Sequence, residues 1–317
     1  MKTLTFVAVV IAKAAIVQSY RITKVMRTAT KEEQEKQVIT EDPEIKKIHK
    51  NQVKFANIMG VVLLTAGYMT GILFIGEGLY KIYYFYEANP NINPTDPKPH
   101  CIFFWFPFNR DEYYKTSILY EIFHILQTLN YNGAAQTVVC SVMVFLKTEL
   151  KILQHNISSL KYSNASNIED ILKKYSKKHQ ELIRSVKDFN ISFQYIILLE
   201  YSMISVTLAT TLLGILEGQN IAFNALFFTM NFLQLFALSW NANEILHESS
   251  SKLADAIYFC PWYEFDTPCK YLILFMLLKC KTPLAIANGP FGHLTMEAAV
   301  SRIKLSYSVV SVFSTST

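Results

Sequence analysis

Long apolar runs alternate with polar, charged segments along the chain. A helix needs roughly 20 mostly apolar residues to cross the hydrocarbon core of a bilayer. Four runs clearly meet that length, over residues 55–79, 118–147, 193–217 and 221–242. A fifth run over 284–314 is interrupted by charged residues, and a sixth, over 1–19, opens the chain and contains one lysine. The pattern therefore predicts an all-α membrane protein with six transmembrane helices.

The segments between these runs differ in length and polarity. Residues 20–54 are predicted to form a polar cytosolic linker, 80–117 an aromatic outer loop, 148–192 a cytosolic helix and 243–283 a set of cytosolic anchor helices. A seam of residues spaced alternately four and three apart precedes the run 193–217 and is typical of a helix that packs against a partner. Its members are Ile168, Leu172, Tyr175, His179, Leu182, Val186 and Phe189. The partner could be another helix of this chain or another subunit.

A short second helix is predicted near the last span. Asp266-Thr267-Pro268 offers a cap followed by a proline in the first turn, which is how helices often begin. The run 271–278 is apolar on all sides and too short to span a bilayer, so we expect it to be buried in protein. Counting it as a span instead would move Thr317 to the cytosol.

Composition supports the membrane interpretation. Hydrophobic residues make up 51% of the 317 residues and charged residues only 17%, against roughly a quarter in soluble domains. Cytoplasmic loops of membrane proteins carry the excess of lysine and arginine. The segments 20–54, 147–187 and 241–283 hold 22 of the 30 basic residues, whereas 80–117 holds four. We therefore expect the three basic segments inside and both chain ends outside.

The first run has an alternative interpretation. The stretch 2–14 resembles a signal peptide, with a basic start, an apolar run and small residues at Ala12 and Ala14. Its removal would place the basic linker outside and reverse every later loop, and the charge distribution argues against that. The run over 1–19 is therefore expected to be retained as a span.

The sequence carries no sign of an enzyme. Nucleotide-binding, hydrolase and metalloprotease motifs are absent, no cofactor is indicated, and the seven histidines are scattered. Five cysteines without a C-x-x-C pair suggest neither a metal site nor a disulfide framework. Nucleic-acid binding is not indicated because the basic residues flank the spans. The glycosylation triplets at Asn156, Asn164 and Asn190 lie on the predicted inner side, so they should be unmodified.

Polar residues inside spans are costly in lipid and therefore informative. In the run 118–147, Glu121 and His124 lie near the outer end, where contact with water would explain them. Asn130, Asn132 and Gln136 lie deeper and are expected to face protein or a cavity. The last span carries Glu297, Arg302, Lys304, Ser301, Ser306, Ser308 and Ser311. Such residues favour a water-lined face, and an ion path is the natural hypothesis.

The carboxyl-terminal residues resemble the closing signature of insect odorant receptors. The matching residues are Pro283-Leu284-Ala285-Ile286, Gly289, Phe291, Leu294-Thr295-Met296 and Ser306-Tyr307-Ser308 through Phe313. Weaker matches are Tyr258, Trp262-Tyr263, Leu274-Phe275-Met276 and Trp105-Phe106-Pro107-Phe108. The related gustatory receptors end in a motif with Gln-Phe, which this chain lacks. The resemblance covers roughly residues 50–317 and favours the odorant branch.

The resemblance implies seven helices with the carboxyl end outside, so six spans fit if this chain lacks the family's first helix. It implies an odorant-binding subunit of a ligand-gated cation channel in olfactory signal transduction. Such subunits form heterotetramers with an odorant receptor co-receptor in the plasma membrane, in sensory neuron dendrites. The alternatives are a gustatory-receptor-like channel subunit and a secondary transporter of small solutes, although no internal repeat supports the latter.

The resemblance also implies site residues. The last helix would line the pore, with Tyr307 in the motif, Val310 as the apolar constriction and Ser314 as the next inward position. Small volatile odorants would bind among apolar and aromatic side chains in the outer half of the bundle. The candidates are Met69, Leu73, Phe74, Phe123, His124, Gln127, Thr207, Thr211, Asn224, Phe227 and Phe228.

Overall fold

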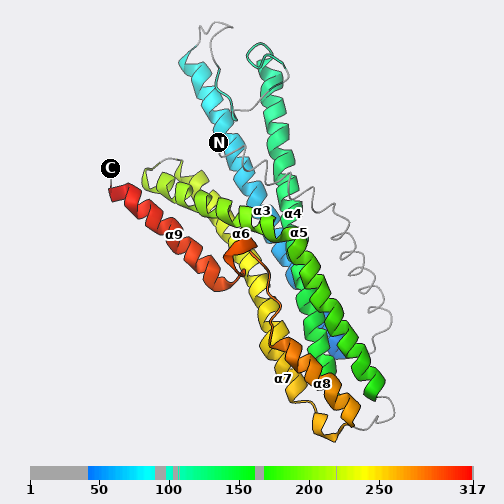
Figure 1. Cartoon of the computed structure of the whole chain (residues 1–317). Coiled ribbons are helices and arrows are strands. Elements are labelled where there is room, and N and C mark those ends of the chain that lie inside the picture. Colours follow the sequence, from blue (N-terminus) through cyan, green and yellow to red (C-terminus); the bar gives the residue numbers. More distant parts are fainter. Residues whose placement is uncertain are drawn as a thin grey trace.

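The computed structural model describes residues 42–89, 98–102, 106, 108–160, 168–218 and 220–315. These residues form helices joined by loops, with one isolated antiparallel bridge between Ala287 and His293. In chain order the helices are α3 (Pro43–Ala88), α4 (Tyr114–Ser158), α5 (Ile168–Leu216), α6 (Ile221–His247), a π-helical turn η2 (Glu248–Lys252), α7 (Leu253–Tyr258), η3 (Trp262–Glu264), α8 (Thr267–Cys280), η4 (Gly289–Phe291) and α9 (Met296–Thr315). The predicted all-α class is confirmed (Figure 1).

Three stretches of described helix are long and apolar enough to cross a membrane. They are α3, α5 and the helix over 221–258 that runs from α6 through α7. The predicted spans on α4 and α9 are less apolar, because α4 carries several buried amide and carboxyl groups and α9 carries three charged residues. The predicted first span, residues 1–19, lies outside the described residues, so the count of six spans remains a prediction.

Two helix beginnings follow from local sequence. Asp42 caps α3, where its side chain accepts a hydrogen bond of 2.9 Å from the Glu44 backbone N–H, and Pro43 occupies the first turn. Asp266 is the residue before α8, and Pro268 lies in the first turn of that helix. Proline suits this position because its missing N–H would have no helical partner there. The predicted start of the helix at 266–268 is confirmed.

The main core lies at the end of the bundle that holds α7 and α8, which we call the inner end (Figure 1). Large side chains from α4, α5 and α6 are almost fully buried there, among them Leu146, Leu150, Leu172 and Ile245. By contrast, less than a quarter of the most apolar window of α3 is buried, at 22%. The inner halves of the helices therefore supply most of the packing within the described chain.

The heptad seam on α5 finds its partner within this chain. Leu172, Leu182, Val186 and Phe189 belong to the same buried cluster as Ile273 of α8 and the inner part of α4. The seam is therefore an internal packing face. Of the two partners that the sequence left open, the structure selects the chain's own helices.

The prediction that 271–278 is buried on all sides is wrong for one face of α8. Ile273 and Met276 are buried, but Tyr271, Leu274 and Phe275 are 59%, 50% and 63% exposed. Leu278 extends the exposed side, at 47%. These four residues are spaced three, one and three apart, so they share one side of the helix; we call them the α8 stripe. A helix that is apolar on all sides gives no sign in its sequence of which side the chain's other helices will cover.

Candidate functional site

The last helix, α9, presents two different faces. Ala299, Ser306 and Val310 are 3%, 5% and 3% exposed, and they pack against the same subunit. Tyr307 is 67% exposed, and Lys304, Ser308 and Ser311 on the same helix are exposed as well. Of the predicted pore residues, Tyr307 therefore faces away from the subunit and Val310 faces into it. Ser314 belongs to α9, but its side chain lies outside the described part.

Helix α9 packs against α5 (Figure 1). The Ser306 hydroxyl donates a hydrogen bond of 3.0 Å to the backbone oxygen of Ser205. One turn earlier, the Arg302 guanidinium lies over the Tyr201 ring, 5.7 Å from its centre. The predicted water-lined face thus excludes Ser306, which is buried against α5, and Arg302, whose charge lies against an aromatic ring. Lys304 is exposed, as that prediction expects.

The predicted odorant-binding residues come from four helices and differ widely in exposure. Met69 and Phe123 are each 59% exposed and Leu73 is 41% exposed, whereas Thr211 is only 4% exposed. The remaining ones are half-buried: Phe74, His124, Gln127, Thr207, Asn224, Phe227 and Phe228.

Part of this set is brought together by Phe223, which the sequence analysis missed. Its ring lies 5.5 Å from Phe74 of α3 and is stacked 5.5 Å from Phe227 on its own helix. Asn224 lies against Gly214 of α5, where an added Cβ would be 2.7 Å from the Asn224 amide nitrogen. The spacing of Phe223 and Phe227, four residues apart, was the signal that could have revealed this cluster.

The α4 members of the set lie in a different aromatic group. His124 contacts Tyr120 with ring centres 4.4 Å apart, and Phe123 contacts His124 at 6.0 Å. Tyr120 in turn meets Phe106 of the outer loop at 5.8 Å. The structure therefore places His124 beside the outer loop, and Phe74 and Phe227 in a separate aromatic group around Phe223.

Glu121 corrects a second expectation. Its side chain is fully buried, at 0% exposure, although the sequence suggested contact with water near the helix end. One carboxylate oxygen lies 2.7 Å from His100 Nδ1, and the other accepts hydrogen bonds from the backbone N–H groups of Cys101 (2.9 Å) and Ile102 (3.4 Å). These donors lie about 20 residues earlier in the loop, so no local pattern could reveal the pairing. Glu121 thus fastens the outer loop to α4.

Cys101, beside this carboxylate, lies in a partly dry environment. Burial, together with the nearby Glu121 charge, raises the pKa of the Cys101 thiol to about 11. A thiol with so high a pKa is protonated at neutral pH and reacts slowly, because the thiolate is the nucleophile. The residue therefore acts as packing under the loop.

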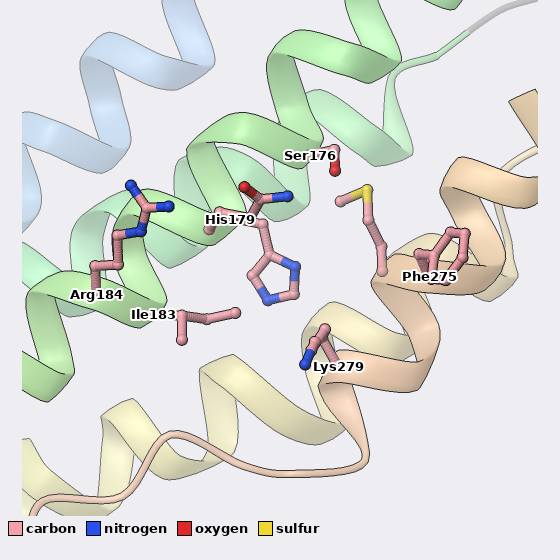
Figure 2. Close-up of a pocket in the computed structure, with 8 residues that line it drawn as sticks. Ser176, His179, Ile183, Arg184, Phe275 and Lys279 are labelled. Atoms are coloured by element: carbon pink, nitrogen blue, oxygen red, sulfur yellow. The ribbon is translucent and has the colours of Figure 1, made fainter.

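A cavity of about 370 Å³ lies between α5 and α8 at the inner end (Figure 2). Its lining combines apolar and polar side chains, and the ring of His179 lies in its middle with Arg184 and Lys279 at its edge. His179 is 3% exposed, and burial lowers its pKa from the usual value. The predicted role of His179 as a packed seam residue is confirmed by its burial.

We expect the buried His179 to make the protein less stable in mild acid. A histidine whose pKa is lowered by folding takes up its proton more readily in the unfolded chain. Stability is therefore unchanged well above pH 6.5 and falls as the pH drops below it, by up to about 1.4 kcal/mol per pH unit. Thermal unfolding of the detergent-solubilised protein between pH 7.5 and 5.5 measures this, and the loss should be smaller in His179→Leu. Equal slopes in His179→Leu and in the exposed-site control His247→Leu would contradict it.

A second, more polar cavity of about 560 Å³ lies between α4 and the π-helical turn. The Glu248 side chain, 1% exposed, accepts hydrogen bonds from Lys252 (2.8 Å) and Gln154 (2.9 Å), and Lys151 lies 3.4 Å away. Burial by itself raises the pKa of Glu248, but these hydrogen bonds and the lysine charges outweigh it and lower the pKa overall. The paired charges tie α4 to the turn, so this cavity is part of the internal framework.

The chain resembles known proteins in sequence. A family model described as 7tm Odorant receptor matches residues 1–307. Odorant receptor 10 of Aedes albopictus is 29% identical over 202 residues, which are 60% of this chain and 54% of that receptor. Odorant receptor 30a of Drosophila melanogaster is 24% identical over 207 residues, which are 62% of this chain and 55% of that receptor. The chain thus aligns with about half the length of these relatives.

The fold also resembles solved structures. The insect olfactory receptor OR5 from Machilis hrabei matches with a TM-score of 0.78 at 12% identity, over 99% of this chain and 79% of that one. The structure of the same receptor in complex with eugenol matches with a TM-score of 0.80 at 12% identity, over 100% of this chain and 80% of that one. At this identity the likeness shows a shared fold. Together with the family match over almost the whole sequence, it establishes that the chain is a multi-pass membrane protein of the 7tm odorant receptor family.

Proposed function

We propose that the chain is the odorant-binding subunit of a ligand-gated cation channel. The observation that carries this proposal is the outward face of α9, where Lys304, Tyr307, Ser308 and Ser311 are exposed on a helix next to the membrane-capable α5. Hydroxyl-bearing and charged side chains are unfavourable against lipid and suit a water-filled path. In an assembly with one α9 per subunit, this face would surround a central pore.

Tyr307, Val310 and Ser314 are the proposed pore residues. The 67% exposure of Tyr307 supports its part. Val310 lies three positions further on, which on a helix of 3.6 residues per turn is a rotation of roughly 60° from Tyr307. A modest turn of α9 would therefore exchange which of the two side chains faces the pore. A ring of apolar side chains can close a pore by excluding water.

The proposed ligand is a small, mainly apolar odorant bound in the outer half of the bundle. The contact of Phe74 with Phe223, beside Phe227 and Asn224, supports this site because an apolar pocket with a few polar groups suits such ligands. The similar Machilis hrabei receptor has a structure in complex with eugenol, so an aromatic odorant is a reasonable first probe.

The proposed assembly is a heterotetramer with an odorant receptor co-receptor, in the plasma membrane of the sensory neuron dendrite and with the carboxyl end outside. The α8 stripe supports a partner at the inner end, because four adjacent exposed apolar side chains on one helix mark an interaction surface. The basic residues of the inner end support a cytosolic location for this surface.

Recordings from cells that express the chain with an insect co-receptor test the function. We expect an odour-evoked cation current. In the same recordings, Tyr307→Ala and Val310→Ala should each change relative ion permeability or ligand-independent leak by at least twofold, because Tyr307 faces the proposed pore and Val310 would enter it when α9 turns. Tyr263→Ala is the matched control, since Tyr263 is also an exposed aromatic residue (64%) but lies in η3, outside α9 and the linker that leads into it.

Two outcomes would contradict these proposals separately. Absence of current across a broad odorant panel, with both subunits at the cell surface, would remove the channel function. Normal current with permeability and leak unchanged in both α9 variants would remove the pore assignment alone.

A further inference from the structure

The linker between α8 and α9, residues 281–295, is a small hairpin. The Leu294 N–H donates to the Ile286 oxygen (2.8 Å), and the Asn288 N–H donates to the Gly292 oxygen (2.9 Å). Ile286 and Leu294 are 0% and 1% exposed, so the hairpin is seated in the core of the inner end. It is also the covalent connection between the inner helices and the proposed pore helix.

One side chain of α5 bonds the free edge of this hairpin. Asn190 Nδ2 donates a hydrogen bond of 2.8 Å to the Ala285 oxygen, and the Ala287 N–H donates one of 3.0 Å to Asn190 Oδ1. In an extended segment, the oxygen of one residue and the N–H of the residue two further on point to the same side. The Asn190 amide thus takes the place of a neighbouring strand. Ile286, whose oxygen points to the other side, is bonded within the hairpin.

Residues further along α5 contact the rest of the linker and then α9. Leu198 fills the space beside Gly289, where an added Cβ would be 2.7 Å from the Leu198 Cδ2 atom. Gly289 has a positive φ of 56°, a backbone conformation that favours glycine. The contacts of Tyr201 with Arg302 and of Ser205 with Ser306 come next. Asn190 is therefore the innermost of a row of α5 contacts, and it holds the linker that leads into α9.

We propose that Asn190 is a positioning residue for the pore helix: its amide clamps the 285–287 backbone to α5 and so sets how readily α9 moves when ligand binds. This inference rests on the proposed channel function. The physical basis is that the clamp satisfies one backbone donor and one backbone acceptor, which would otherwise lose their partners when the linker moves. Moving α9 at its inner end requires breaking both bonds or carrying α5 with it.

The gating test compares variants at equal surface level. Asn190→Ala removes both bonds, and we expect the odorant concentration for half-maximal current to shift at least threefold while relative ion permeability stays unchanged. Asn190→Asp keeps an acceptor for the Ala287 N–H and loses the donor, so a smaller shift should result. A variant that only misfolds would lower the surface level and the maximal current, and would leave the half-maximal concentration unchanged. An unchanged half-maximal concentration in Asn190→Ala would overturn the proposal.

Ser192→Ala is the matched control because Ser192 lies on the same turn of α5 and completes the Asn190-Ile-Ser192 glycosylation triplet. If a lost glycan caused the effect, Ser192→Ala would reproduce it, and the clamp would be rejected. If the clamp causes it, Ser192→Ala should behave as the unmodified chain.

A second measurement does not depend on current. Ala299, in the first turn of α9, is 3% exposed. In a chain whose five cysteines are replaced by serine, Ala299→Cys should react slowly with a maleimide, and the further change Asn190→Ala should speed the reaction at least threefold. Lys304→Cys, at an exposed position, gives the upper rate. An unchanged rate at position 299 would refute the clamp even in a functional channel, whereas a faster rate in a chain without current would leave the clamp standing and reject the channel.

Discussion

Replacing Glu121 by alanine is expected to release the outer loop and to cost about 3 kcal/mol of stability, because a buried hydrogen-bond donor left without an acceptor costs about 1–3 kcal/mol. His100, 1% exposed, would lose the carboxylate 2.7 Å away, and its other ring nitrogen has only Asp111, at 3.6 Å. The backbone N–H groups of Cys101 and Ile102 would lose their acceptor as well. Buried donors without a partner carry the full cost of losing water.

Two measurements on the purified protein test this result. The thermal unfolding midpoint should fall in Glu121→Ala, and trypsin should cut the bond after Arg110 at least tenfold faster, because the loop would leave its place on α4. Glu121→Gln keeps one acceptor oxygen and should be intermediate. Glu112→Ala is the matched control, since Glu112 is an exposed carboxylate of the same loop. If Glu121→Ala were as stable and as protease-resistant as this control, the loop would not depend on Glu121.

Replacing Leu274 and Leu278 together by aspartate is expected to abolish the proposed assembly with a co-receptor. Both side chains lie in the α8 stripe and are about half exposed in the single subunit, at 50% and 47%. The subunit should therefore fold normally, because a carboxylate at an exposed position remains in water. In an interface the same carboxylates would be buried without partners, which costs several kcal/mol.

Co-purification of the two subunits measures this effect, and a fall of at least tenfold is expected, together with loss of the odour-evoked current. Thr267→Asp with Thr282→Asp is the matched control, because both threonines are exposed at the two ends of the same region and lie outside the stripe. Equal co-purification of the two double variants would show that the stripe does not contact the co-receptor.

The helical elements could be predicted because their signals are local. The start of α8 at Thr267-Pro268 was predicted because it depends on residues that are neighbours in sequence. The start of α3 after Asp42 depends on neighbours in the same way, although it lies inside the segment that the sequence predicted as a linker. The stretch from the heptad seam into the next apolar run contains no proline or glycine, and the structure has one long helix there, α5. Apolar length alone indicated the membrane class.

The direction in which side chains point, toward the chain's own helices or away from them, could not be predicted in the same way. The seam on α5 required a partner, but its spacing is the same whether that partner is α8 or another subunit. The run 271–278 was predicted to be buried because it is apolar on all sides. Such a run gives no sign of which side of α8 the chain's own helices leave exposed. For Val310 the family resemblance implied a pore position, whereas the packing of α9 on α5 decides which way the side chain points.

The sequence by itself determined that this is a helical membrane protein with its basic residues gathered at one end, and it led to the odorant receptor family through the residues after Tyr258. Only the tertiary structure decided that Glu121 holds the outer loop and that Asn190 holds the linker of α9. The physical reason is distance along the chain. Hydrophobic runs, caps and charge excess act within a few residues, whereas Asn190 and Ala285 are 95 positions apart and meet only after the helices between them have packed.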